Sequence, residues 1–258
     1  MPKARPAHRT TLSRELIIEA GFRVVDADEM DQVTMSRLGR ELGADPSAMY
    51  RHFRSKDELM LAMADVMLEE TVSAYVEGDA PADNLRRMGW ALRTAYLRRP
   101  GLARVVASRF TGGDAEAYCV RTMVENIQQL GYDQDAAIAR TRAFAELTLG
   151  HIIMTADVLA LPRKTQTFEL EMMRSYYIYS RQPLQRMSLE ESRAAHLADG
   201  DEVYGTILET FLAGLVADAP LAAADASRGS GGGTKPPRAV SVARSRTSPA
   251  ARERAARA

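Results

Sequence analysis

The apolar residues of this chain recur mostly at intervals of three and four, which is the period of an amphipathic α-helix. The sequence has no sustained two-residue alternation of apolar and polar residues and no hairpin turn signal, so it gives no indication of strands. The pattern predicts helices over residues 13–27, 56–77, 83–98, 102–110, 114–130, 133–159, 188–196 and 201–216, and one near 168–179. The predicted fold class is therefore all-α.

Residues 34–59, TMSRLGRELGADPSAMYRHFRSKDEL, predict two short helices joined by a tight turn and followed by a longer helix. Thr34 can cap the first of them with its hydroxyl group. Leu38 and Leu42 stand four residues apart on one inward face. Gly43 follows where the chain must reverse, because glycine adopts a left-handed conformation without steric cost.

Asp45 and Pro46 predict the start of the second short helix, a capping carboxylate followed by proline at the first helical position. We expect this helix to run from Pro46 to about Phe53 and to bury Met49 and Phe53. The side chains left to project are those of Ser47, Ala48, Tyr50, Arg51 and His52. Such helices usually present their outer face to a DNA major groove, although a plain helical hairpin in an all-α core is the alternative.

Several residues of this segment resemble the signature of the TetR/AcrR family of one-component bacterial repressors. They are Thr34-Met35, Leu42-Gly43 and the run from Ser47 to Leu59, with Tyr50, Phe53, Lys56 and Leu59 at the family's spacing. The resemblance covers about residues 12–65. One departure is the absence of the glycine that commonly ends the first helix near Glu29, where this chain reads DADEMD over residues 26–31.

The resemblance implies a ligand-responsive repressor that binds a palindromic operator as a homodimer and is released by a small-molecule inducer. We expect base contacts from Ser47, from Ala48 against a thymine methyl group, and from Arg51, which could equally bind phosphate. The predicted DNA-binding residues are Thr34, Arg37, Asp45, Ser47, Ala48, Tyr50, Arg51, His52 and Lys56. The alternatives are a ligand-independent regulator or activator, or a helical protein-interaction adaptor.

Charge supports DNA binding only through its placement. The net charge is zero, and residues 1–60 hold ten basic and ten acidic side chains. Residues 221–258 hold eight Lys and Arg against two acids. The local cations are Lys3, Arg5, His8, Arg9 and Arg14 near the N-terminus and Arg51, His52, Arg54 and Lys56 around the presented helix.

The chain divides into four predicted regions. These are a disordered basic arm over 1–11, a helix-turn-helix domain over 12–58, a helical ligand-binding and dimerisation domain over 59–219, and a disordered basic tail over 220–258. The helix over 56–77 connects the two domains.

The last predicted helix is apolar on two faces, which indicates two packing partners. We expect one to be a second copy of the chain, with deeper burial in the monomer as the alternative. The predicted dimer interface is Tyr204, Ile207, Leu208, Phe211, Leu212 and Leu215. The resemblance implies a four-helix interface, and the helix over 133–159 is the candidate partner.

The resemblance also implies an inducer pocket within residues 82–200. The candidate lining residues are Trp90, Tyr96, Phe110, Tyr118, Met123, Phe144, His151, Met154 and Thr155, each of which could instead be plain core.

Other functions find no support in the sequence. There is no catalytic or nucleotide-binding motif, so we expect no enzyme, no cofactor and no metal site. The single cysteine, Cys119, cannot form an internal disulfide, and no signal peptide is visible. The apolar stretch over 143–161 is broken by charged residues and predicts a buried helix rather than a membrane span. We therefore expect a cytoplasmic, nucleoid-associated protein with no membrane partner.

Overall fold

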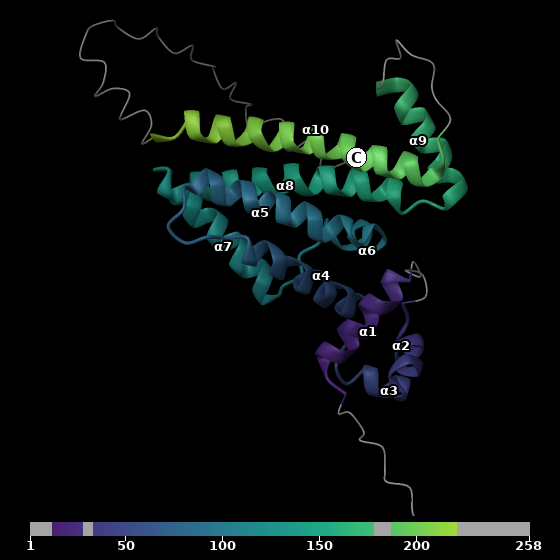
Figure 1. Cartoon of the computed structure of the whole chain (residues 1–258). Coiled ribbons are helices and arrows are strands. Elements are labelled where there is room, and N and C mark those ends of the chain that lie inside the picture. Colours follow the sequence, from purple (N-terminus) through teal and green to yellow (C-terminus); the bar gives the residue numbers. More distant parts are fainter. Residues whose placement is uncertain (1–11, 28–32, 178–186, 221–258) are drawn as a thin grey trace, which may run out of the picture. The chain divides into compact units, whose positions relative to one another are not determined.

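The computed structural model describes residues 12–27, 33–177 and 187–220, and every regular element in these ranges is a helix (Figure 1). The all-α prediction is therefore confirmed. The helices are α1 Arg14–Asp26, α2 Met35–Leu42, α3 Pro46–Met49, α4 Lys56–Ser73, α5 Pro81–Leu97, α6 Pro100–Val106, α7 Asp114–Gln129, α8 Gln134–Leu159, α9 Arg163–Tyr177 and α10 Leu189–Ala217.

All ten helices belong to one compact unit, Met1–Ala223. Contacts between α1, α2, α3 and α4 form the N-terminal part. Helices α5, α6 and α7 also pack on α4, and α8, α9 and α10 complete the second part by packing on these helices and on one another. The predicted boundary at residues 58 and 59 thus falls inside a continuous helix. The predicted arm over 1–11 and almost all of the predicted tail lie outside the described residues.

Helix α4 ends at Ser73, four residues earlier than predicted. The cause is Asn84 of α5, which is buried and bonds the next segment through its side chain. Its Oδ1 accepts from the Val76 amide at 2.9 Å and its Nδ2 donates to the Val76 carbonyl at 2.9 Å. These bonds hold residue 76 out of the helix.

Proline starts both α5 and α6, where its missing amide hydrogen costs nothing. Helix α6 therefore begins at Pro100 rather than at Leu102 as predicted. Helix α7 begins after Gly113, which offers no capping side chain. Asp65 of α4 supplies the cap instead, since its carboxylate accepts from the Glu116 amide at 3.0 Å and from the Ala115 amide at 3.3 Å.

Helix α10 is continuous, whereas the sequence predicted two helices separated near residues 197–200. Ser188 and Glu191 form a capping box at its start. Gly200 stays helical and is buried beside Arg93, where an added Cβ would lie 3.0 Å from the guanidinium Nη2. Packing against α5 thus keeps a residue in the helix that sequence signals alone would place at a break.

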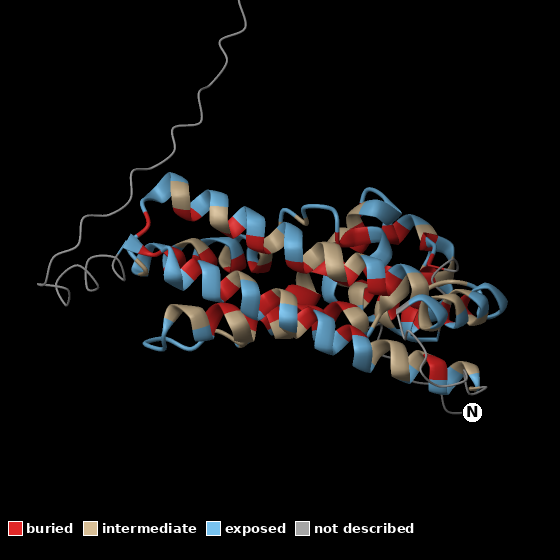
Figure 2. Ribbon diagram, turned by 90° about the horizontal axis from the view of Figure 1, so that it is seen from above, coloured by how far each residue is buried: buried red, intermediate tan, exposed pale blue. Residues whose placement is uncertain are grey.

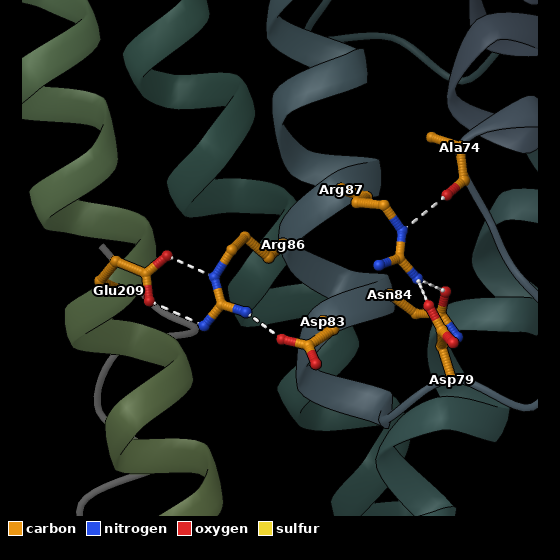
Figure 3. A network of polar contacts seen from close by, with 7 residues as sticks. All are labelled: Ala74, Asp79, Asp83, Asn84, Arg86, Arg87 and Glu209. Carbon is orange, nitrogen blue, oxygen red and sulfur yellow. Dashed lines mark hydrogen bonds and ion pairs between the residues drawn. The ribbon is translucent and has the colours of Figure 1, made fainter.

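Buried residues line the inner faces of the helices and exposed residues the outer ones (Figure 2). Polar contacts add to this core at the edge of α5 (Figure 3). Arg86 pairs with Glu209 of α10 at 2.6 Å, and Arg87 pairs with Asp79 at 2.8 Å and donates to the Ala74 carbonyl at 3.3 Å. No helix within the described ranges has both the length and the apolar character needed to cross a membrane.

Candidate nucleic-acid interface

Helices α2 and α3 meet through a turn whose local signals act as predicted. Thr34 Oγ1 accepts from the Arg37 amide at 3.1 Å and starts α2. Gly43 ends it with φ 61°, the left-handed conformation. Gly39 allows the close approach that follows, because a Cβ there would lie 2.8 Å from the Ala44 carbonyl oxygen. Asp45 Oδ1 then accepts from the Ser47 amide at 2.8 Å and starts α3.

Helix α3 is shorter than predicted, ending at Met49 rather than near Phe53. Residues 50–52 continue as turns, in which the amide of Arg51 bonds to the carbonyl of Ala48 and that of His52 to Met49. The Phe53 amide still bonds to the Met49 carbonyl at 3.0 Å. Met49 and Phe53 are both fully buried, as predicted, and they hold α3 against the core while its outer face stays exposed.

The outer face carries most, but not all, of the predicted side chains. Ser47, Tyr50, Arg51 and Lys56 are exposed, Thr34 is exposed and His52 is partly so. Ala48 is less open than predicted, because only 8% of it is accessible and it packs in the hydrophobic core. Little of its side chain is therefore available to a thymine methyl group.

Three exposed cations of the helix-turn-helix segment are not held in salt bridges. Arg51 and Lys56 make no salt bridge within the part of the chain that the structure describes, and the same holds for Arg40. Sequence reasoning missed Arg40, which is exposed on α2 opposite the buried Leu38. Its position two after Leu38 could have identified it as outward-facing.

Arg14, one of the cations that the sequence places near the N-terminus, is the first residue of α1 and makes its contacts within the fold. Its Nη1 donates to the His52 carbonyl and pairs with Glu58 at 3.3 Å, and its guanidinium lies 4.1 Å from the Phe53 ring centroid. The carboxylate of Glu58 also accepts from the Arg54 amide at 2.8 Å, rather than from the Ser55 amide that a full capping box would use. These bonds lower the pKa of Glu58, with the Arg54 amide the largest cause.

Asp45 lies at the face but its carboxylate is occupied as the α3 cap. Hydrogen bonds from the Ser47 hydroxyl and amide lower its pKa, so the carboxylate stays ionised. A negative charge that caps a helix would repel a phosphate, and its role is therefore to shape α3.

The predicted dimer residues lie on two sides of α10. Tyr204, Leu208, Leu212 and Leu215 are buried in the chain's own core, which corrects that part of the prediction in favour of the monomer alternative. Ile207 and Phe211 are only partly buried. Val203, which is 46% exposed, stands one turn before Ile207 and continues this apolar surface on the outer side.

The predicted pocket residues also separate. Phe110 and Met154 are 84% and 74% exposed and therefore line no interior pocket, while Tyr96, Met123 and Phe144 are core residues. Tyr118 lines a groove of about 840 Å³ together with residues of α1 and α4. Trp90, His151 and Thr155 do gather, because the rings of Trp90 and His151 lie 5.0 and 5.3 Å from that of Tyr204 and Thr155 Oγ1 lies 3.4 Å from His151 Nε2.

Comparison with known sequences agrees with this architecture. The pattern of bacterial regulatory proteins of the tetR family matches residues 17–63, and that of the tetracycline repressor-like C-terminal domain matches residues 77–219, more than half of the chain. The chain belongs to the TetR family. Its members are transcription regulators with a helix-turn-helix DNA-binding part and are not a class of enzyme.

Two curated relatives illustrate the range of similarity. This TetR-family chain is 29% identical over 109 residues to an HTH-type transcriptional repressor of Mycobacterium tuberculosis, a match that covers 42% of either chain. The chain thus spans less than half the length of that relative. It is 26% identical over 145 residues to the class D tetracycline repressor protein of Escherichia coli, covering 55% of this chain and 66% of the other.

Solved structures share the fold over a longer stretch. A putative transcriptional regulator of Streptomyces coelicolor is 25% identical and superposes with a TM-score of 0.60 over 81% of this chain and 99% of the other. ActR from the same organism, in complex with (S)-DNPA, has a TM-score of 0.62 at 20% identity over 81% of this chain and 100% of the other. BioQ with its double-stranded DNA operator has a TM-score of 0.51 at 25% identity over 57% and 89%.

Proposed function

We propose that this TetR-family protein is a transcriptional repressor that binds operator DNA through α2 and α3. The observation that carries the proposal is one exposed face on which Ser47, Tyr50 and Arg51 stand over the buried anchors Met49 and Phe53. Arg40, Arg51 and Lys56 are exposed in this segment and make no salt bridge among the described residues, which gives phosphate groups an attractive surface although the chain has no net charge.

Individual side chains take different parts in the proposed complex. Ser47 and Arg51 reach base edges in the major groove. Tyr50, His52 and Lys56 bind phosphates, and Thr34 and Arg37 position the DNA backbone. Arg40 also binds a phosphate, because its side chain is exposed on α2, the helix that carries Arg37.

The proposed operator complex contains two copies of the chain. The outer side of α10 and the adjoining α8 supply the interface, and the two copies of α3 then stand about one DNA turn apart, roughly 34–36 Å, or a multiple of it. The operator is accordingly near-palindromic.

The proposed release of the protein from operator DNA depends on the contacts between α4 and the elements around it. Asp57 of α4 bonds Arg109 with its Oδ2 at 2.6 Å from Nη2, Asp65 of α4 caps α7, and Asp26 at the end of α1 bonds Arg99 at 2.6 Å. An inducer bound among α5, α8 and α10 shifts these partners, tilts α4 and changes the separation of the two α3 helices. Tetracycline repressor and ActR are named or titled for small molecules, which supports an inducer here as well.

Substitution of Tyr50 and Lys56 separates this function from that of a protein-interaction adaptor. We expect Tyr50→Ala and Lys56→Ala each to weaken binding to a selected duplex by roughly tenfold, with Lys56→Ala also reducing the salt slope by about one. Fluorescence anisotropy of a labelled duplex measures both effects. The control is Arg142→Ala, since Arg142 is 80% exposed on α8 and pairs only with Glu146 among the described residues.

Unchanged DNA binding in both variants, together with loss of a protein complex, would show the adaptor to be the correct reading. If no small molecule releases the protein from DNA, the protein is a ligand-independent regulator.

A further inference from the structure

Arg93 is a buried cation at the meeting point of α5, α8 and α10. Its side chain is 2% exposed. Nε donates to Asp201 Oδ1 at 2.8 Å, and Nη2 lies 2.8 Å from the same oxygen and 3.5 Å from the Leu197 carbonyl oxygen, while the guanidinium stands 5.2 Å from the Tyr204 ring centroid. Nη1 is buried and has no acceptor among the residues that the structure describes.

This arrangement compensates the buried charge only in part. The Asp201 side chain is 58% exposed, so solvent weakens the attraction that it offers. A guanidinium that serves the fold alone usually has acceptors for all of its donors, because a buried unpaired donor is destabilising. Within the described residues Nη1 therefore lacks an acceptor, and a bound molecule can supply one.

The surroundings of Arg93 suit an organic ligand rather than an isolated ion. Trp90 and Tyr204 provide aromatic surfaces, and Thr155 and His151 provide polar atoms from α8. His196 of α10 has its Nε2 buried without a partner among the described residues. It borders a cavity of about 50 Å³ between α9 and α10, which Leu170, Met173 and Ala195 line together with Arg174, Ser192 and Asp199.

We propose that Arg93 receives the carboxylate of the inducer, and that the inducer is a small organic acid with an aromatic or apolar body. This inference rests on the proposed repressor function. One carboxylate oxygen accepts from Nη1 and the other takes over Nη2 from Asp201, so that the two neighbouring nitrogens form a bidentate pair with the ligand. The apolar body packs on Trp90, which is only partly buried, and enlarges the space beside His196.

Asp201 competes with the ligand for the same cation. Because this carboxylate is more than half exposed, it can turn into solvent when the ligand carboxylate arrives. Removing its charge should therefore tighten the binding of an acid, whereas removing the cation should weaken it.

Paired probes test the inference by isothermal calorimetry and thermal unfolding of the full chain. The probes are benzoate and 1-naphthoate, each compared with its neutral amide. We expect the acids to bind more tightly than the amides, Arg93→Gln to weaken acid binding roughly tenfold or more, and Asp201→Asn to tighten it. Arg86→Gln is the matched control, because Arg86 also lies on α5 and pairs with a carboxylate of α10, but at the surface.

Equal binding of acids and amides, no binding of either acid to the unsubstituted protein, or unchanged acid binding in Arg93→Gln would each overturn the inference. If Arg93→Gln does not fold, Arg93→Lys replaces it, since it keeps the charge but loses the planar fork and should also weaken acid binding. Duplex binding without any acid is measured in parallel. Loss of that binding contradicts the repressor function, whereas duplex binding without acid binding contradicts only the inference.

Discussion

Gly39 lies where the backbone of α2 comes closest to the turn that precedes α3. An added Cβ would meet the Ala44 carbonyl oxygen at 2.8 Å and the Pro46 nitrogen at 3.3 Å, and backbone atoms cannot move away as a flexible side chain can. We predict that Gly39→Ala lowers the free energy of unfolding by about 1–3 kcal/mol and weakens duplex binding, because α3 shifts. Urea unfolding measures the first effect.

Gly150 is the matched control, since it also lies within a helix but its Cβ would enter open space. Gly150→Ala should raise stability by about 0.5–1 kcal/mol through helix propensity. Similar effects of the two substitutions would contradict a close approach at Gly39.

His151 makes the stability depend on pH. Burial, with the charge of Arg93 as the next cause, lowers its pKa below the ordinary 6.5, and burial lowers that of His196 although Asp199 opposes the shift. The unfolded chain then binds protons more readily than the folded one below pH 6.5. We predict that these two histidines leave the free energy of unfolding unchanged above about pH 6.5 and lower it as the pH drops below that value.

Denaturant unfolding of His151→Gln over this pH range checks the origin of the effect. The slope below pH 6.5 should decrease relative to the unsubstituted protein. A slope that does not change would assign the dependence to other groups.

Residue-level features that depend on neighbours in sequence were predictable. The caps at Ser13, Thr34 and Asp45 and the left-handed Gly43 all follow from local hydrogen bonding and backbone sterics. The burial of Ala48 was not predictable, because it depends on how α3 packs against the other helices. Arg93 was overlooked although it stands three residues before the buried Tyr96, on the same helix face, where a charged residue signals a special environment.

At the scale of elements, the spacing of apolar residues predicted which segments are helices. The errors concern the positions of helix ends, which depend on contacts with residues distant in the sequence. Asn84 stops α4 early, and packing on Arg93 keeps α10 continuous through Gly200. The start of α7 shows the same dependence, because its cap comes from Asp65 of α4 and not from its own sequence.

We predict that Asp65→Ala lowers the free energy of unfolding by about 1–2 kcal/mol, since the first amides of α7 lose their acceptor. Thermal or urea unfolding measures the loss. Glu125→Ala removes a carboxylate from an exposed position of α7 and should change stability by no more than about 0.5 kcal/mol. Equal losses in the two variants would contradict the capping role.

At the scale of the whole molecule, the proposed dimer depends on the outer side of α10. Val203→Asp with Ile207→Asp places two charges on this partly exposed apolar surface. We predict a monomer in sedimentation equilibrium and weaker operator binding, because two linked half-sites are no longer held together. Val120→Asp on α7, where Val120 is 47% exposed, should leave the dimer intact. A dimer that survives the double substitution would place the interface elsewhere.

Sequence-specific DNA binding is the central claim, and selection from a pool of random duplexes tests it most directly. The full chain is equilibrated with the pool at near-physiological salt, and the bound fraction is sequenced. Enrichment of a near-palindromic sequence, with half-sites about one helical turn or a multiple of it apart, is the predicted result. Salt-sensitive binding without any enriched sequence would contradict the account, because it would mean that charge alone holds the DNA.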